Sequence, residues 1–213
     1  MTDKKSFTIQ KEKSLLQINL SGGRIQELVL NTVPILGTFT RIDGKKGNTH
    51  LCVPNFGKEG TEKYNLPNHG PARKAKWQFI NQTDSSLTIG YDMPKAGSYP
   101  TTLSIVQIFS LTNNTCKHEV QITNSGSKKA PVNLAIHYYW HTAQGWSNIQ
   151  LNNQNVGGGS AKSSLSFKQS ADAGGTALVA LQVSNPAKIF QFASNNLSLT
   201  FGKTAAVNLF ETP

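Results

Sequence analysis

The sequence has 213 residues, of which 37% are hydrophobic, and its 21 Lys and Arg against 11 Asp and Glu give a formal net charge of +10. Apolar residues recur in short runs along the chain, which fits a folded domain better than a disordered protein, and the length suits one large domain or two small ones. The charge favours an anionic partner, but the cations form neither a basic helix nor an aromatic-interleaved RNA motif. We therefore expect no nucleic-acid and no membrane partner, with nucleic-acid binding open only as the weakest alternative.

The two cysteines are too few for a disulfide framework. Cys52 and Cys116 each fall in an apparent strand, which predicts buried free thiols in a reducing compartment. The first residues lack the apolar core of a signal peptide, and no run of about eighteen apolar residues occurs. We expect a soluble, cytoplasmic protein.

Alternation of apolar and polar residues dominates the chain and predicts strands rather than helices. A hairpin is predicted where two alternating runs, 103–111 and 116–123, flank a four-residue turn. In chain order, we expect strands at 7–11, 15–20, 25–30, 33–39, 77–81, 86–92, 103–111, 116–123, 132–141, 178–183, 189–192, 197–201 and 206–210.

Two segments lack this alternation. Residues 41–76 are rich in Gly and Pro and predict a long loop, and 155–166 is a Gly/Ser-rich stretch that predicts a flexible loop. A long loop within a compact domain is usually functional, so we expect 41–76 to fold over the domain and help to form a site. Many short strands without a helical window indicate an all-β fold, an antiparallel sandwich or barrel, in a single domain over 1–213.

The predicted strand at 132–141 has two unlike faces. Val132, Leu134 and Ile136 alternate on one face and suit the core. The other face carries hydrogen-bonding side chains: Asn133, His137, Tyr139 and His141. Such a face is open to two interpretations, a ligand site or a polar network that satisfies itself between two sheets. The aromatic residues nearby would suit a sugar, whose C–H faces pack on rings.

Glu211 is the other residue with catalytic potential. It shares strand parity with Val207 and Leu209, so a strand that continued to 211 would surround the carboxylate with apolar neighbours. Such surroundings would make it a better proton acceptor. The pattern alone favours the alternative, a solvated glutamate near the C-terminus. No CxxC, G-x-G-x-x-G or G-x-S-x-G motif points to a zinc, dinucleotide or serine-hydrolase site.

Several segments, read in order, resemble one known family. These are "VPNFGKEG", "LPNHGPARKAKW", "YDMPKAGSYPTTLSIVQIFSL", "CKHEVQITNSG", "NLAIHYYWH" and "NLFETP". They resemble the hexose-6-phosphate mutarotases (glucose-6-phosphate 1-epimerases) of the galactose mutarotase-like superfamily. The likeness runs from about residue 24 to the end, and its H-G-x-A-R…W and A-I-H-Y-Y-W pieces are the most specific.

The resemblance implies a large, twisted antiparallel β-sandwich, here somewhat shortened, with a concave sugar site. It implies an aldose 1-epimerase that interconverts the α and β anomers of a hexose or hexose 6-phosphate, acting as a monomer without metal or organic cofactor. By motif, His137 is the general acid and Glu211 the general base. The expected substrate-binding residues are His69, Arg73, Asn55, His141 and Tyr139.

The chain departs from this family pattern at three points. "GKKGNTHLCVPNFG" lacks the expected Arg-Gly-Gly, for which Lys45 or Lys46 is an approximate replacement, and Lys74 stands where an asparagine follows the arginine. The stretch from His137 to Glu211 is also shorter than is usual. These departures keep an alternative open: a sugar-binding or regulatory relative with little or no turnover.

Overall fold

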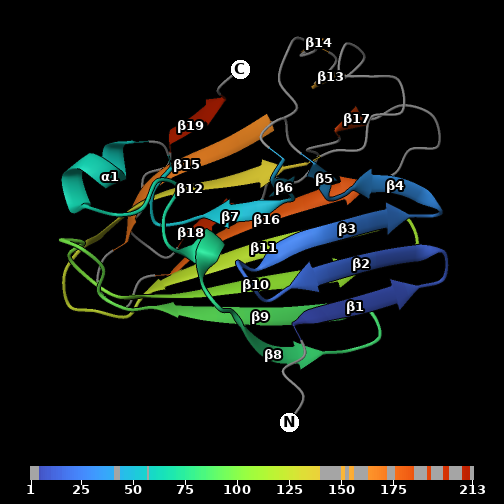
Figure 1. Ribbon diagram of the computed structural model, residues 1–213, viewed down its shortest axis with the longest axis horizontal. Coiled ribbons are helices and arrows are strands. Elements are labelled where there is room, and N and C mark those ends of the chain that lie inside the picture. The colour runs from blue at the N-terminus through green and yellow to red at the C-terminus, as the bar shows by residue number, and fades with distance from the viewer. Residues whose placement is uncertain are drawn as a thin grey trace.

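The computed structural model describes residues 5–40, 44–56 and 58–139, except for the side chains of residues 59 and 138. Beyond residue 139 it describes the backbone of the strands only, at 150–151, 154–155, 163–171, 176–184, 191–192, 199–201 and 208–211. Figure 1 shows most strands of the chain stacked in layers, with a short helix at one end.

The first layer is a six-stranded antiparallel sheet. Its middle strands alternate strictly: every second residue of Leu103–Leu111 is buried, and Thr115–Asn124 follows the same period. This is the pattern of a sheet with one face on the core. The spatial order is β18 (Leu199–Phe201), β16 (Thr176–Ser184), β11 (Thr115–Asn124), β10 (Leu103–Leu111), β9 (Ser86–Met93) and β8 (Gln78–Gln82).

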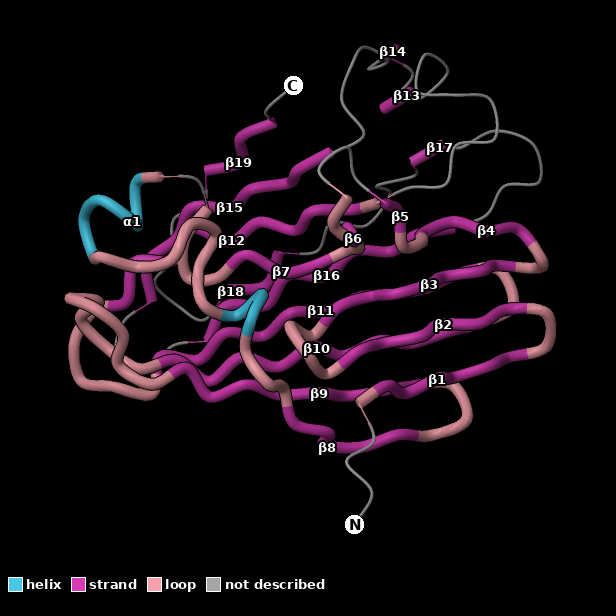
Figure 2. The backbone as a smooth tube through the Cα atoms, viewed as in Figure 1, coloured by secondary structure: helices cyan, strands magenta, loops and turns pink. Residues whose placement is uncertain are grey.

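Two four-stranded sheets form the opposing side of the sandwich (Figure 2). One is ordered β1 (Ser6–Lys11), β2 (Ser14–Asn19), β3 (Arg24–Leu30) and β4 (Val33–Leu36). The other is ordered β19 (Asn208–Glu211), β15 (Ser163–Ala171), β12 (Ala130–Tyr138) and β7 (His50–Cys52). The backbone N–H of Ile25 donates to Thr49 O at 3.0 Å, which ties β3 to the chain entering β7.

Smaller elements complete the described chain. They are β5 (Phe39–Thr40), β6 (Lys46–Gly47), α1 (Glu59–Tyr64), the 3₁₀ turn η1 (Ala72–Lys74), β13 (Gln150–Leu151), β14 (Gln154–Asn155) and β17 (Gln191–Phe192). In the part of the chain that the structure describes, no helix is long and apolar enough to cross a membrane.

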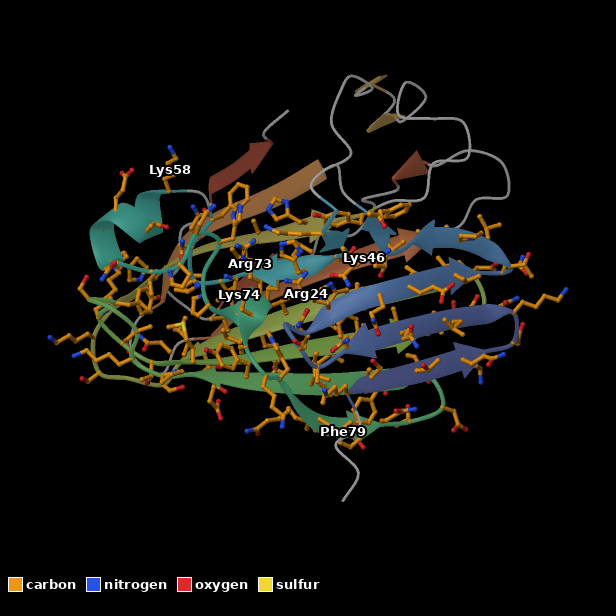
Figure 3. The ribbon with its side chains drawn as sticks, in the orientation of Figure 1. Arg24, Lys46, Lys58, Arg73, Lys74 and Phe79 are labelled. Carbon is orange, nitrogen blue, oxygen red and sulfur yellow. The ribbon has the colours of Figure 1, made fainter. Side chains whose placement is uncertain are left out.

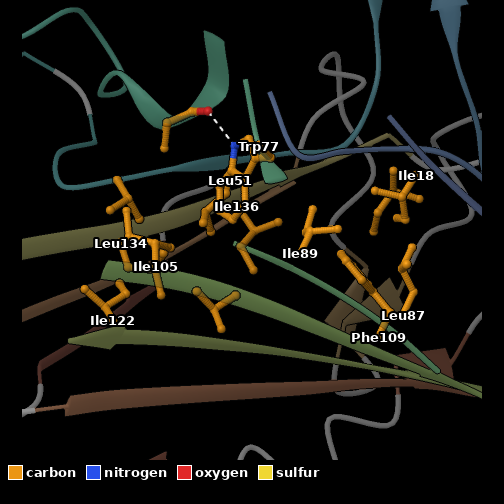
Figure 4. Packing of buried hydrophobic residues seen from close by; sticks show 14 of the residues in the cluster. Ile18, Leu51, Trp77, Leu87, Ile89, Ile105, Phe109, Ile122, Leu134 and Ile136 are labelled. Atoms are coloured by element: carbon orange, nitrogen blue, oxygen red, sulfur yellow. Dashed lines mark hydrogen bonds between the residues drawn. The ribbon is translucent and has the colours of Figure 1, made fainter. Parts of the chain in front are cut away.

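The core lies between the six-stranded sheet and the two smaller sheets (Figure 4). Ile105 of β10 and Ile136 of β12 are both at most 2% exposed. Burying one such side chain contributes about 1.5–3 kcal/mol. Trp77 is fully buried, and its indole N–H donates to Ala72 O at 3.0 Å, which fixes η1 on the core.

The all-β, antiparallel sandwich predicted from the alternation is confirmed, as is the hairpin of β10 and β11. Cys52 and Cys116 are both buried and free, as predicted. The expectation of a structureless loop at 41–76 is wrong, because the segment contains β7, α1 and η1. All three residues of β7 are buried, so the strand has no exposed face and shows no alternation.

Several boundaries also differ from the predicted ones. The strand expected at 33–39 is interrupted between β4 and β5. The Gly/Ser-rich stretch expected to be a loop at 155–166 ends in strand, because β15 begins at Ser163. The strand expected to reach residue 141 ends at Tyr138.

Candidate active site

The pairing of β12 with β7 brings two histidines together. His137 stands opposite His50, and Ala135 stands opposite Cys52. Directly paired residues of an antiparallel sheet share a face, so His50, Cys52 and His137 lie on one face and Leu51 and Ile136 on the core face. The alternation thus separates the two faces as the sequence indicates.

A third histidine reaches this face from the segment after α1. His69 adopts a left-handed backbone with φ 63°, and Gly70 follows with φ 72°. The left-handed conformation costs a non-glycine residue about 1–2 kcal/mol, and such strain is typical of functional sites. A Cβ on Gly70 would collide with the carbonyl oxygen of Val53, so only glycine fits here.

These residues form a compact group, which we call the histidine cluster: His50, His69, His137 and Phe56. The His69 and His137 ring centroids are 5.0 Å apart, and those of His50 and His137 are 5.1 Å apart. The Phe56 ring stacks on His69 at 5.2 Å. His50 and His137 are only 7% and 8% exposed, so the rings meet in a largely desolvated place.

Two arginines, Arg24 and Arg73, lie near each other (Figure 3), and the charges of both act on His50 of the cluster. Arg73 is carried by η1, which Trp77 anchors, and the Nε atom of Arg73 is buried without an acceptor among the described residues. Arg24, at the start of β3, donates from Nη2 to Arg73 O and from Nη1 to Asn48 Oδ1, both at 2.9 Å. Burial and the nearby Arg73 charge lower the pKa of Arg24.

Sequence reasoning missed Arg24 and Asn48. Arg24 follows a Gly-Gly turn and looks like an ordinary first residue of a strand. Its approach to Arg73 depends on the packing of β3 beside η1, which no local pattern reveals.

His50 has a fixed ring orientation. Its Nδ1 lies 2.8 Å from Asn48 O, and since a carbonyl can only accept, Nδ1 carries the proton. Burial lowers the pKa of His50 to about 4, helped by the charges of Arg24 and Arg73. The ring is therefore neutral at pH 7, and its buried Nε2 has no partner among the described residues.

His50, Cys52 and His137 together could in principle hold a metal ion, since their ligand atoms lie within 4.8 Å of one another. Burial, however, raises the pKa of the Cys52 thiol to about 12, so the sulfur is protonated. The two arginines add positive charge close to the same atoms. Imidazole and thiol are ligands for zinc or copper, but these surroundings disfavour a divalent cation.

Asn55, predicted to bind substrate, directly precedes Phe56 of the histidine cluster in the chain. It is 3% exposed, donates from Nδ2 to Pro67 O at 3.3 Å, and lines a cavity of about 140 Å³ with Tyr99 and Asn133. Asn133 precedes His137 by four residues on β12, which is about 13 Å along a strand. The Oδ1 atoms of both asparagines are buried without a donor among the described residues.

The remaining predicted residues are placed only in part. Tyr139 is buried with its ring centroid 6.2 Å from that of His50. His141 lies outside the described residues. Glu211 ends β19 in register with Leu165, which pairs with Ile136. The Glu211 backbone is thus two strands, about 10 Å, from β12. It lies level with Ile136, the residue before His137. The role of Glu211 as the base stays a prediction.

Comparison with known proteins identifies the family. The family model for aldose 1-epimerase matches residues 5–158, a span that includes His69, Arg73 and His137 but not Glu211.

Solved structures show the same fold at low identity. A galactose mutarotase related enzyme from Lactobacillus acidophilus superposes with a TM-score of 0.59 at 13% identity, covering 86% of this chain and 82% of its own. A galactose mutarotase-like protein from Lactobacillus casei gives 0.57 at 14% identity, with 86% and 83% covered. Another from Clostridium acetobutylicum gives 0.55 at 11% identity, with 97% and 95% covered. The fold is the galactose mutarotase-like sandwich, and on the match over residues 5–158 the chain belongs to the aldose 1-epimerase family.

Proposed function

We propose that this protein is a mutarotase that interconverts the α and β anomers of a hexose or a hexose 6-phosphate. The observation that carries the proposal is the contact of His69 with His137 at 5.0 Å between ring centroids, in a chain of this family. Two imidazoles from distant segments converge on a desolvated face, where hydrogen bonds to a sugar are stronger than in water.

In this proposal, His137 donates a proton to the ring oxygen while Glu211 removes the proton of the anomeric hydroxyl. The bond between C1 and the ring oxygen breaks, and an open-chain aldehyde forms. Rotation about C1–C2 presents the other face of the aldehyde, and ring closure returns both protons. Imidazole suits the first role because its ordinary pKa lies near 6.5, so it gives and takes protons at neutral pH. His69 binds the sugar next to the sugar ring.

The arginines make a phosphorylated hexose a reasonable substrate. Arg24 and Arg73 stand side by side, with the Arg24 guanidinium bonded to the Arg73 backbone. Neighbouring guanidinium groups repel each other unless an anion lies near them, and a phosphate accepts bidentate hydrogen bonds from such groups. A phosphate would therefore relieve the repulsion that lowers the pKa of Arg24.

The test is anomer exchange followed by NMR with glucose, galactose and glucose 6-phosphate. We expect the wild type to exchange at least one of them faster than buffer, and His137→Gln to lose that acceleration. His118→Gln is the matched control, since it alters a buried histidine that contacts none of the cluster residues by any described bond. Exchange at the buffer rate for all three sugars with the wild type rules out the epimerase proposal.

A second candidate is a sugar-binding relative without turnover. Two observations favour it. The backbone of Glu211 lies level with Ile136, which faces the core, and not with His137. The family match also ends before Glu211. Sugar-dependent stabilisation against heat, combined with exchange at the buffer rate, would support this candidate. If wild type is active and Glu211→Gln loses the activity, the candidate is rejected.

A further inference from the structure

One polar atom of the histidine cluster has no place in the mechanism above. The Nε2 atom of His50 belongs to a ring that is 7% exposed and has no partner among the described residues. The bond from Nδ1–H to Asn48 O fixes both the tautomer and the ring orientation. Nε2 is therefore a preformed acceptor, and it lies on the face that carries His137.

The spacing of the surrounding atoms shows what such an acceptor could bind. Ring nitrogens of His50 and His137 and the Cys52 sulfur lie within 4.8 Å of one another. Two atoms that each hydrogen bond to the same oxygen at about 2.8 Å stand about 4.6 Å apart at a tetrahedral angle. Two nitrogens that coordinate one zinc ion at about 2.0 Å stand only about 3.3 Å apart. The 4.8 Å limit admits an oxygen atom that is hydrogen bonded to two of these groups.

The charges favour a hydroxyl group over a metal ion. Arg24 and Arg73 both act on His50 and on Cys52, so a divalent cation here would be repelled by two guanidinium groups. A hydroxyl group is neutral and both donates and accepts. It can donate to His50 Nε2, and its oxygen can accept from a donor of the same surroundings, such as the buried Arg73 Nε–H.

We propose that His50 is a further substrate-binding residue, whose Nε2 accepts a hydrogen bond from one hydroxyl of the sugar bound against His137. The inference rests on the proposed function and adds a determinant of specificity to it. Because the acceptor is fixed in the sheet by β7, it selects sugars that present a hydroxyl at one ring position and in one configuration.

The experiment compares parent hexoses with their monodeoxy analogues. In the wild type, one deoxy position is expected to lower kcat/KM about tenfold, the value of one hydrogen bond. In His50→Phe, kcat/KM for the parent sugar should fall about tenfold, while kcat/KM for that analogue stays at its wild-type value. The discrimination between the two sugars then disappears. His50→Gln, which returns an acceptor near the Nε2 position, should restore part of it. His118→Phe, the same change at a buried histidine outside the cluster, should keep the wild-type discrimination.

A direct measurement covers the case in which His50→Phe fails to fold. In ¹⁵N-histidine-labelled wild type, saturation with the parent sugar should shift the His50 Nε2 resonance, and the critical deoxy analogue should not. An unchanged resonance, or unchanged discrimination in an active His50→Phe, overturns this inference alone. Stoichiometric zinc or copper in the purified protein that is lost in Cys52→Ser also overturns it. A wild type that neither binds nor exchanges any hexose overturns the proposed function together with the inference.

Discussion

His118 and His50 are both buried histidines, and they differ in what surrounds them. His118, on β11, is 4% exposed, stacks on Phe109 at 4.5 Å and bonds through Nε2 to Gln107 Oε1 at 2.9 Å. The Gln107 amide donates to Gly23 O at 3.1 Å, which orients the amide and makes His118 Nε2 the donor. His50 bonds to Asn48 in the same way through its other nitrogen.

Each ring also leaves one nitrogen without a partner among the described residues: Nδ1 in His118 and Nε2 in His50. An unpaired nitrogen therefore does not identify a site. Around His118 the described contacts are an aromatic ring and one amide, whereas around His50 two further imidazoles and two guanidinium groups converge. Convergence of polar groups from separate segments distinguishes a candidate site from a histidine of the core.

The largest expected effect is a loss of stability in acid, to which both histidines contribute. Burial lowers the pKa of His118 to about 3 and that of His50 to about 4, below the unfolded value near 6.5. The stabilisation they provide is therefore present above pH 6.5 and is lost as pH falls through the folded values. Each should cost about 3 kcal/mol between pH 7 and pH 4, a large part of a typical folding free energy. Urea unfolding at a series of pH values measures this loss.

His118→Leu separates the two contributions. At pH 7 the variant should be less stable, because Gln107 Oε1 loses its donor, at a cost of about 1–3 kcal/mol. The variant has no imidazole to take up a proton on unfolding, so acid destabilises it less than the wild type. The difference in unfolding free energy between the two should therefore shrink as the pH falls. A constant difference from pH 7 to pH 4 would show that His118 is not the acid-sensitive group.

The next effect separates stability from activity. His118→Ala removes a fully packed ring and should cost about 3 kcal/mol in unfolding free energy, with kcat/KM unchanged in the folded fraction. His137→Ala should lower kcat by about 10²–10⁴-fold, the usual contribution of a positioned acid. Urea unfolding and NMR exchange on the same two variants provide the comparison. Equal activity losses in both would mean that the histidine cluster has no special role.

The sequence predicted the framework of the fold more fully than the site. Strict alternation in β10 and β11 indicated a sheet with one buried face, and it gave His137 its polar face on β12. It could not indicate β7, because all three of its residues are buried. The alternation therefore gives no indication of His50, although this residue pairs directly with His137.

Arg24 illustrates the other limit. Lys45 and Lys46 are the cations that the sequence offers near the expected phosphate arginine, and Lys46 instead donates to Thr40 Oγ1 at 2.7 Å. The guanidinium that does approach Arg73 comes from a strand about fifty residues earlier, through hydrogen bonds to Asn48 and Arg73. Contacts of this kind depend on the relative placement of two sheets and a turn. They leave no periodic signal in the chain.

The smallest expected effect tests the electrostatic part of the contrast. Arg24 lowers the pKa of His50, although burial contributes more. Arg24→Met should therefore raise the pKa of His50 slightly, while the pKa of His118, which burial alone lowers, should not move. NMR chemical shifts of both rings, followed over the pH range in which the protein stays folded, compare the two responses in one sample. A shift of His118 as large as that of His50 would mean that the substitution loosens the whole sandwich, and that the local charge of Arg24 is not the cause.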